Sequence, residues 1–229
     1  MACEAGGWMR MPIGIVTGMR AEASIARRCT ALVASTGGAA LGADTKADEL
    51  IGRGATALIS LGIAGGLSDD VPTGTVVIAT GVIVRQATIA TDEAWGARLR
   101  AGFPGSVAGL VLGGDRIIGS AAQKAELFRR TGALAVDLES GGVARAAAGA
   151  GVPFAVVRAV ADAAGTDLPP AALVGLDGDG GVALGPLLAS LWRQPGQIRH
   201  LLTTARDARA ALRALMLGVR ALGAELTPA

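Results

Sequence analysis

Short apolar runs alternate with segments of helical spacing along most of this chain. The runs are rich in Ile, Val, Leu and Ala, which is typical of buried strands, whereas the segments between them repeat apolar residues every three or four positions. Expected strands are 11–17, 31–34, 57–63, 75–80, 108–112, the run that starts at 133, and 153–161; expected helices are 21–28, 47–54, 123–130 and 141–149. Strands that alternate with helices predict an α/β fold whose parallel or mixed sheet is covered on both faces.

The composition fits one domain with a single large core. The chain has 229 residues, of which 51% are hydrophobic and 17% are charged, and this length is short for two full domains. Aromatic residues make up only 3% and Tyr is absent, so Ala, Val, Leu and Ile must fill the core. We expect residues 1–10 to be a disordered lead-in and residues 11–229 to form one domain.

Charge, cysteine and histidine content exclude several classes of function. A net charge of +2, with no aromatic residues interleaved among basic ones, argues against a nucleic-acid partner. Cys3 and Cys29 lack metal-binding spacing, and His200 is the only histidine, so we expect neither a metal site nor a Ser-His-Asp triad. No basic-then-apolar leader and no apolar stretch long enough to span a bilayer are seen. The expected location is the cytoplasm.

A long C-terminal helix is predicted over residues 196–223. Its apolar stripe consists of Leu201, Ala205, Ala208, Leu212, Leu215, Val219 and Leu222, and arginines occupy much of the remaining surface. A stripe of this kind packs against the core or against another subunit. Alternatively, a basic amphipathic helix touches a membrane surface. The sequence leaves both interpretations open, and a membrane scaffold would use the second.

Acidic residues follow three of the expected strands. Asp137 and Glu139 come after the run from 133, Asp162 ends the run 153–161, and Glu22 follows the first strand. The carboxyl ends of parallel strands meet at the edge of the sheet where ligands usually bind. These carboxylates therefore predict general acid/base work on a small polar substrate, although a charge at a helix start would also explain Glu139, and a turn or cap would explain Asp162.

Two glycine-rich segments carry weaker signals. The segment 62–67 (GIAGGL) follows a buried strand, and its glycines allow positive φ or close approach of the backbone to a ligand. A tight strand-to-helix turn explains this segment equally well, and it is not a dinucleotide fingerprint. The segment 177–180 (DGDG) resembles part of a calcium loop, but the rest of that loop is missing, so no metal is expected there.

Four segments together resemble the superfamily of purine nucleoside phosphorylases and methylthioadenosine/adenosylhomocysteine nucleosidases. They are TGMRAEA at 17–23, GIAGGL at 62–67, VDLES at 136–140 and VVRAVAD at 156–162, in the family's order and spacing. The resemblance implies a three-layer α/β/α fold with a mixed, twisted central sheet. It also implies cleavage of the N-ribosidic bond of an adenine nucleoside and assembly as a homo-oligomer, either a dimer or a hexamer.

Roles for individual residues follow from the resemblance. Asp162 would protonate or hydrogen-bond purine N7, Glu139 would bind the ribose hydroxyls, and Glu22 would orient the nucleophile. The implied substrate-binding residues are Met19, Ile63, Ala64, Gly65, Ile117, Ile118 and Leu138. No cofactor is implied, and either water or a phosphate co-substrate can be the nucleophile, with Arg20 and Arg85 as candidate phosphate ligands.

Three positions depart from the family pattern. Ala161 stands where the family has Ser, Leu138 replaces Met, and Ile117 replaces the aromatic ring that stacks on the base. The loss of the hydroxyl at 161 and of the ring at 117 also favours an alternative hypothesis, in which the protein binds nucleosides without catalysis.

A narrower resemblance extends over nearly the whole chain. The segments DLPPAALV at 167–174, RQPGQ at 193–197 and ARDARAAL at 205–212 are similar to the hopanoid-associated phosphorylases. This subfamily implies release of adenine from adenosylhopane, a lipid-linked nucleoside, and would give the C-terminal helix a reason to contact a membrane. The alternatives within the same class are methylthioadenosine/adenosylhomocysteine hydrolysis and futalosine hydrolysis.

Overall fold

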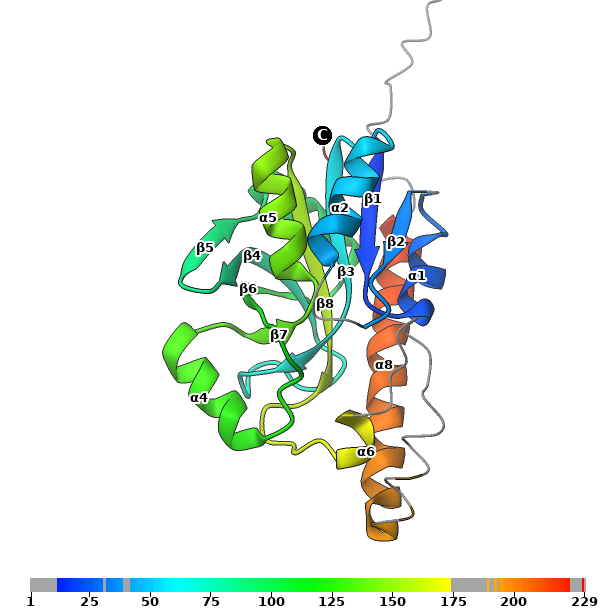
Figure 1. Ribbon diagram of the computed structural model, residues 1–229, viewed down its shortest axis with the longest axis vertical. Coiled ribbons are helices and arrows are strands. Elements are labelled where there is room, and N and C mark those ends of the chain that lie inside the picture. Colours follow the sequence, from blue (N-terminus) through cyan, green and yellow to red (C-terminus); the bar gives the residue numbers. More distant parts are fainter. Residues whose placement is uncertain are drawn as a thin grey trace, which may run out of the picture.

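The computed structural model describes residues 12–30, 32–38, 42–173, 189, 192, 194–222 and 228. Within them a twisted, mixed sheet lies between helices that cover both of its faces (Figure 1). The fold class predicted from the sequence is thereby confirmed. The predicted lead-in at 1–10 and the glycine–aspartate cluster at 177–180 lie outside the described residues.

Eight strands form the sheet. They are β1 (Ile13–Thr17), β2 (Val33–Ser35), β3 (Ala57–Gly66), β4 (Val76–Val84), β5 (Ala87–Ala90), β6 (Val107–Gly113), β7 (Ala135–Asp137) and β8 (Phe154–Asp162). Their order is β2-β1-β3-β7-β6-β4-β5, and β8 pairs with both β3 and β4. The strands β3, β8, β4, β6 and β7 therefore pair in a closed ring, while β1 and β2 extend the sheet from β3 as parallel neighbours.

The helices divide between the two faces of the sheet. They are α1 (Arg20–Ala26), α2 (Ala43–Gly52), α3 (Glu93–Gly102), α4 (Ala121–Thr131), α5 (Ser140–Ala150), α6 (Pro170–Leu173) and α8 (Ile198–Leu222), the last preceded by a 3₁₀ turn at Pro195–Gln197. One hydrophobic core joins the sheet to α1, α3 and α8, and a second joins it to α2 and α5. This arrangement is the three-layer architecture that the resemblance implied.

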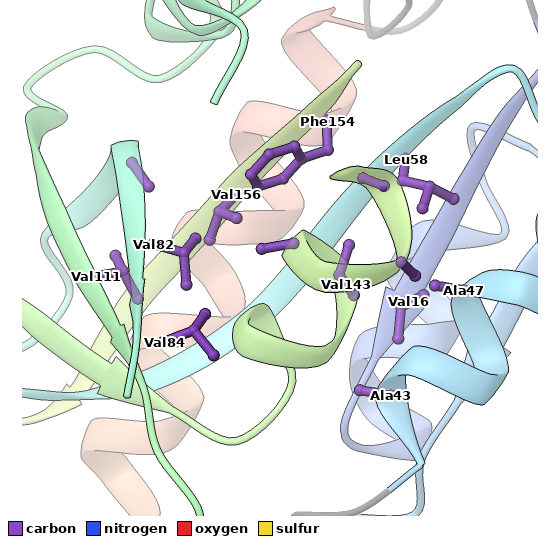
Figure 2. Packing of buried hydrophobic residues seen from close by; sticks show 14 of the residues in the cluster. Val16, Ala43, Ala47, Leu58, Val82, Val84, Val111, Val143, Phe154 and Val156 are labelled. Carbon is purple, nitrogen blue, oxygen red and sulfur yellow. The ribbon is translucent and has the colours of Figure 1, made fainter. Parts of the chain in front are cut away.

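Small side chains let the helices approach the sheet closely, as the shortage of aromatic residues predicts. Figure 2 shows Ala43 and Ala47 of α2 beside Val143 of α5, over the side chains of Val16 and Leu58 from the sheet. A Cβ added to the α5 residue Gly142 would lie 2.7 Å from the Ala43 Cβ. Only glycine therefore permits this helix contact, and the close packing fixes the position of α5.

The C-terminal helix packs against the core. Ala211, Leu215 and Val219 are fully or almost fully buried and belong to the core shared with α1 and α3. The exposed side of the same helix carries Ile198, which is 47% exposed, and Leu202, which is 55% exposed. Contact with a second subunit or with a membrane stays a prediction. Among the described residues, no helix is long and apolar enough to cross a bilayer.

The structure corrects the turn reading of the segment 62–67. The strand β3 continues through Gly66, and none of the glycines in this segment has positive φ. Their function is close contact, because a Cβ on Gly62 would lie 2.3 Å from Nη1 of Arg158. The structure also contains two elements that were not predicted. They are β5, which forms a hairpin with β4, and the helix α3.

Candidate active site

A pocket of about 160 Å³ lies at the carboxyl ends of the parallel strands β1, β3 and β8. The residues that line it include every acidic and substrate-binding residue that the resemblance implied: Met19, Glu22, Ile63, Ala64, Gly65, Ile117, Ile118, Leu138, Glu139 and Asp162. They come from segments that are far apart in the sequence. Glu22 follows β1, Asp162 ends β8, and Glu139 follows β7, which runs antiparallel to β3. The meeting of these strand ends brings the three carboxylates to one cavity.

Glu22 is held by three backbone N–H groups. Its Oε2 accepts hydrogen bonds from the N–H of Gly18 (2.8 Å) and of Met19 (2.7 Å), at the start of α1. Its Oε1 accepts one from the N–H of Ile63 in β3, also at 2.8 Å. Burial raises the pKa of Glu22, while the charge of Arg158 and the three N–H donors oppose that rise. Glu22 thus links the first helix to β3 and presents a fixed carboxyl to the pocket.

Glu139 is an acid of the site whose pKa lies far above its ordinary value. Its side chain is 7% exposed, and Oε1 accepts a hydrogen bond from Oγ1 of Thr36 at 3.3 Å. Burial, opposed by Arg158 and reinforced by the charges of Asp137 and Glu22, raises the pKa of Glu139 to about 8. Because Glu139 shares one guanidinium with two other carboxyls, it keeps its proton at neutral pH.

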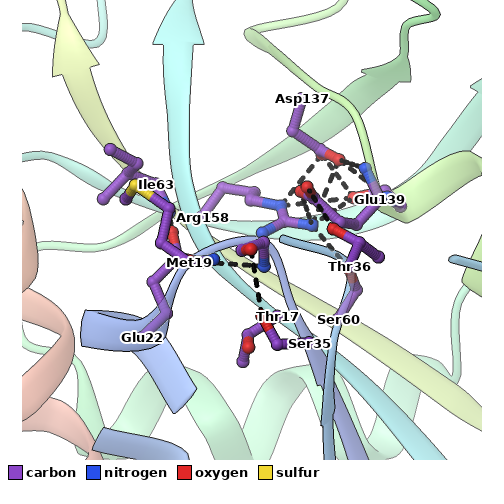
Figure 3. Close-up of polar contacts among 12 residues, drawn as sticks. Thr17, Met19, Glu22, Ser35, Thr36, Ser60, Ile63, Asp137, Glu139 and Arg158 are labelled. Carbon is purple, nitrogen blue, oxygen red and sulfur yellow. Dashed lines mark hydrogen bonds and ion pairs between the residues drawn. The ribbon is translucent and has the colours of Figure 1, made fainter. Parts of the chain in front are cut away.

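Arg158 is a site residue that the sequence reading missed. Its side chain is fully buried; Nε lies 2.9 Å from Oδ2 of Asp137, and Nη2 lies 3.5 Å from Oε2 of Glu139. Nη2 also donates to Oγ of Ser60 at 2.5 Å. Figure 3 shows the guanidinium between Glu22 on one side and the acidic pair on the other. A lone Arg inside the apolar run 153–161 was the available signal, because a buried charge requires a partner.

Asp137 has a structural role beside this network. Its Oδ1 accepts hydrogen bonds from the backbone N–H groups of Glu139 and Ser140, each at 2.7 Å, at the start of α5. The Ser140 hydroxyl donates to Oδ2, which also faces Arg158. Asp137 therefore fixes both the guanidinium and the backbone that carries Glu139.

Asp162 lies on another wall of the pocket, against Gly65 of β3. Its Oδ2 accepts a hydrogen bond of 2.5 Å from Nζ of Lys124, a fully buried residue of α4. Burial raises the pKa of Asp162, and Lys124 opposes the rise by its charge and its hydrogen bond. The sequence carried no signal for Lys124, because a lysine in an amphipathic helix is usually exposed.

The pairing of β8 with β3 is interrupted at Asp162. Val160 pairs with Ala64, but the next pair is Asp162 with Gly65, so Ala161 is an extra residue in β8. Such a bulge changes the direction of the side chain that follows it and is common beside active sites. The family's Ser position therefore falls on the bulge itself, and Ala161 lines the pocket with a methyl group.

The two arginines suggested for phosphate binding lie outside the pocket lining. Arg20 is an exposed first residue of α1, and Arg85 is exposed at the turn between β4 and β5. Within the described residues, Arg116 is the cationic side chain that lines the pocket. The described residues also hold no group of His, Cys, Asp and Glu suited to a metal ion. Phosphate binding by Arg20 or Arg85 stays a prediction.

The arrangement separates two kinds of chemistry. Glu22 accepts a hydrogen bond from Ile63, while Asp162 lies against Gly65. The apolar side chains of Ile117, Ile118 and Leu138 line the same pocket. An acid with a raised pKa on one wall can donate a proton to a leaving group. The Arg158 network on the other wall can bind hydroxyls and stabilise positive charge.

Comparison with known proteins identifies the family of this chain. Residues 12–175 match the Phosphorylase superfamily. The chain is 34% identical over 135 residues to the futalosine hydrolase of Streptomyces coelicolor; this match covers 51% of the chain and 57% of the relative, a little over half of its length.

Solved structures show the same fold at lower identity. The native futalosine hydrolase of Helicobacter pylori has a TM-score of 0.60 at 18% identity, with 90% of this chain and 98% of that chain covered. The 5′-methylthioadenosine/S-adenosylhomocysteine nucleosidase of Neisseria meningitidis, in complex with methylthio-immucillin-A, has a TM-score of 0.63 at 20% identity, with 91% and 99% covered. Because the family match spans most of the chain and contains all three carboxylates, this protein belongs to the phosphorylase superfamily.

Proposed function

We propose that this protein is a nucleosidase, which cleaves the N-ribosidic bond of an adenine nucleoside with water as the nucleophile. The observation that carries the proposal is the convergence of Glu22, Glu139 and Asp162 on one pocket, with Arg158 buried between the two glutamates. The rest of the pocket wall is largely apolar, as a purine face requires.

The bond to be broken dictates what each wall must supply. As the C1′–N9 bond lengthens, its electron pair moves onto the purine and positive charge develops on the sugar. Asp162 would protonate N7, so that the base leaves as a neutral molecule. Burial raises the pKa of Asp162 above its ordinary value, which makes this carboxyl a better proton donor than an exposed one.

The opposite wall would bind the sugar and the attacking water. Glu139 would hydrogen-bond to the ribose hydroxyls, and its ionised form, which is populated as the pH approaches its pKa of about 8, would stabilise the developing cation. Nη1 of Arg158 is buried without a hydrogen-bond partner among the described residues, and a Cβ on Gly62 would touch both this atom and Oε1 of Glu22. A water bound between them would be oriented by the guanidinium and would lose its proton to Glu22.

The charges of this wall favour water over phosphate. Two acidic side chains, Glu22 and Glu139, face the region where the nucleophile would bind, and each adds negative charge there when it is ionised. Arg158 is already paired with Asp137 and Glu139, so it does not offset a second anion. A phosphate dianion would therefore be repelled, whereas a neutral water would not.

The named relatives support hydrolysis of a nucleoside with a 5′ substituent. Futalosine, methylthioadenosine and adenosylhomocysteine are thus the first substrates to test. Adenosylhopane is a second candidate, favoured by the segments at 193–197 and 205–212 that are similar to hopanoid-associated phosphorylases. The exposed Ile198 and Leu202 of α8 add apolar surface suited to a lipid substituent.

The test measures release of the free base by chromatography from each of the four compounds, with and without phosphate. We expect release without phosphate, and release that strictly requires phosphate would overturn the choice of water. Asp162→Asn should keep the fold and lower kcat by about 10²–10⁴-fold, the usual contribution of a general acid. Binding of all four compounds without release of base would favour the non-catalytic binding module instead.

A further inference from the structure

Lys124 carries a buried ammonium group directly behind the acid of the pocket. Its side chain has no exposed surface. Nζ donates hydrogen bonds to Oδ2 of Asp162 (2.5 Å), to the carbonyl of Ala163 (2.9 Å) and to the carbonyl of Thr166 (2.9 Å). A lysine ammonium has three N–H donors, and each one has a defined acceptor. These three bonds fix the orientation of the ammonium group, and Asp162 is hydrogen-bonded to this fixed group.

Two of these three bonds would suffice to attach α4 to the loop after β8. The bonds to Ala163 and Thr166 go to backbone carbonyls, which a neutral donor could also satisfy. The bond to Asp162 is different, because it goes to a carboxyl that lines the pocket. This third bond joins the ammonium to an acidic side chain and uses Oδ2, so Oδ1 is the oxygen left to carry the proton and face a ligand.

No hydroxyl from the preceding residue shares this task. Ala161 occupies the bulge before Asp162 and offers only a methyl group. In the part of the chain that the structure describes, Lys124 is the side chain that hydrogen-bonds to Asp162. The direction of the carboxyl thus depends on a residue 38 positions away in the sequence.

The charged groups around Asp162 are few. Lys124 approaches from α4 and Asp207 from α8, while Arg116 and the two glutamates of the site line the same pocket. Lys124 favours the ionised carboxyl, and Asp207 disfavours it. When Lys124 is removed, the two remaining influences on the pKa of Asp162 are its burial and the charge of Asp207, and both raise this pKa.

We propose that Lys124 is a positioning residue for Asp162: it binds Oδ2, turns Oδ1 toward the base of the substrate and sets the pH range in which Asp162 donates its proton. This inference rests on the proposed nucleosidase function. An acid must be protonated to donate, so activity falls as the pH rises through its pKa. Because Lys124 lowers that pKa, its removal should move the alkaline limb of the pH profile upward.

The experiment compares Lys124→Met with Lys124→Gln on the full chain. For Lys124→Met we expect kcat to fall about 100-fold, the usual effect of a misplaced catalytic group, with KM changed less than about 3-fold and the alkaline limb moved to higher pH. Lys124→Gln retains an N–H donor without the charge, so it should show the same movement of the limb with a smaller loss of kcat.

The matched control is Ser120→Ala, which weakens the start of the same helix without contact to Asp162. The Ser120 hydroxyl accepts a hydrogen bond from the N–H of Gln123, and its loss should lower stability while leaving the pH profile unchanged. If the lysine variants lower kcat without moving the alkaline limb, Lys124 only supports the fold and the proposal is overturned.

A second measurement does not depend on catalysis. Carbon-13 NMR of Asp carboxyls, with the Asp162 signal assigned by its loss in Asp162→Asn, gives the pKa of Asp162 in the wild type and in Lys124→Gln. A higher pKa in the variant is expected, and equal values would refute the pairing. If no nucleoside is cleaved but this pKa difference is found, the proposed function fails while the coupling of Lys124 to Asp162 stands.

Discussion

At the level of single residues, the carboxyl of Glu139 is the clearest case of a side chain whose chemistry differs from its usual behaviour. Glu22, Asp137 and Glu139 all lie within the field of one guanidinium, that of Arg158. Glu139 is buried beside the other two acids, and its pKa rises to about 8 from an ordinary value of 4.5. The folded protein therefore holds a proton at Glu139 that the unfolded chain releases above about pH 4.5.

This proton makes stability depend on pH in a predictable direction. Between pH 4.5 and 8 the folded state binds more protons at Glu139 than the unfolded state, so the free energy of unfolding falls as the pH rises through this window. Glu139→Gln mimics the protonated form. We expect the free energy of unfolding of the variant, measured relative to that of the wild type, to rise by a few kcal/mol from pH 5 to pH 8. One pKa unit corresponds to about 1.4 kcal/mol.

Urea unfolding at both pH values measures this difference. Glu49→Gln removes a carboxyl that is 50% exposed on α2, and it should leave the pH dependence of the unfolding free energy as it is in the wild type. A constant offset between the wild type and Glu139→Gln at pH 5 and pH 8 would contradict the proton assigned to Glu139.

At the level of secondary-structure elements, β3 shapes the site through its glycines. The strand passes so close to the Arg158 network that a Cβ on Gly62 would lie 2.3 Å from Nη1 of Arg158 and 2.8 Å from Oε1 of Glu22. The guanidinium cannot move aside freely, because Asp137 and Ser60 hold it. The glycine is therefore needed for the position of both charged groups.

We expect Gly62→Ala to lower stability by about 1–3 kcal/mol, the usual effect of overpacking, and to lower kcat by displacing Glu22. Gly149→Ala is the matched control: a Cβ there meets nothing within 4 Å, and Ala inside a helix is about 0.5–1 kcal/mol more favourable than Gly. Thermal unfolding and base release measure both effects. Wild-type activity in Gly62→Ala would show that β3 does not constrain the site.

At the level of the folded chain, α8 completes the core from the C-terminal end of the sequence. Leu215 has no exposed surface and packs in the core with residues of β1, β3 and β8. Leu217, two positions later on the same helix, is 62% exposed. The two leucines lie in the same helix, one buried and one exposed. Replacing each of them by Ala changes helix propensity equally, so a difference in stability between the two variants measures core packing.

Leu215→Ala should lower the free energy of unfolding by about 2–5 kcal/mol, because it removes buried methyl groups and leaves a cavity. Leu217→Ala should change the free energy of unfolding by less than about 0.5 kcal/mol. Urea unfolding checks both values. Equal effects of the two substitutions would mean that α8 is not docked on the sheet as described.

Prediction from the sequence was most accurate where a segment is both buried and regular. The expected strand 153–161 is β8 within one residue at each end, and the expected helix 123–130 is α4 within two. The strand β5 was missed because it is short and largely exposed, so it lacks the apolar pattern of a core strand. The helix α3 was missed although Asp92 caps it and Trp95 and Leu99 are buried four residues apart.

For the site, motifs located the three carboxylates but not the groups that control them. Glu22, Glu139 and Asp162 each follow a recognisable strand, and their segments match one family in order and spacing. Lys124 has no motif of its own, and Arg158 stands out only as a lone charge inside an apolar run. Both residues are fully buried beside acids that are distant along the chain, and these acidic partners cannot be identified from the neighbouring sequence.

Local patterns thus determined the class of fold and the positions of the acids, because hydrophobic periodicity and strand ends are properties of short segments. Tertiary structure decided the chemistry of those acids. It closed β3, β8, β4, β6 and β7 into a ring, placed one guanidinium among three carboxyls, and set an ammonium behind Asp162. Proton affinity in a buried site depends on the charges and the solvent exclusion around it, and these arise only when distant segments pack together.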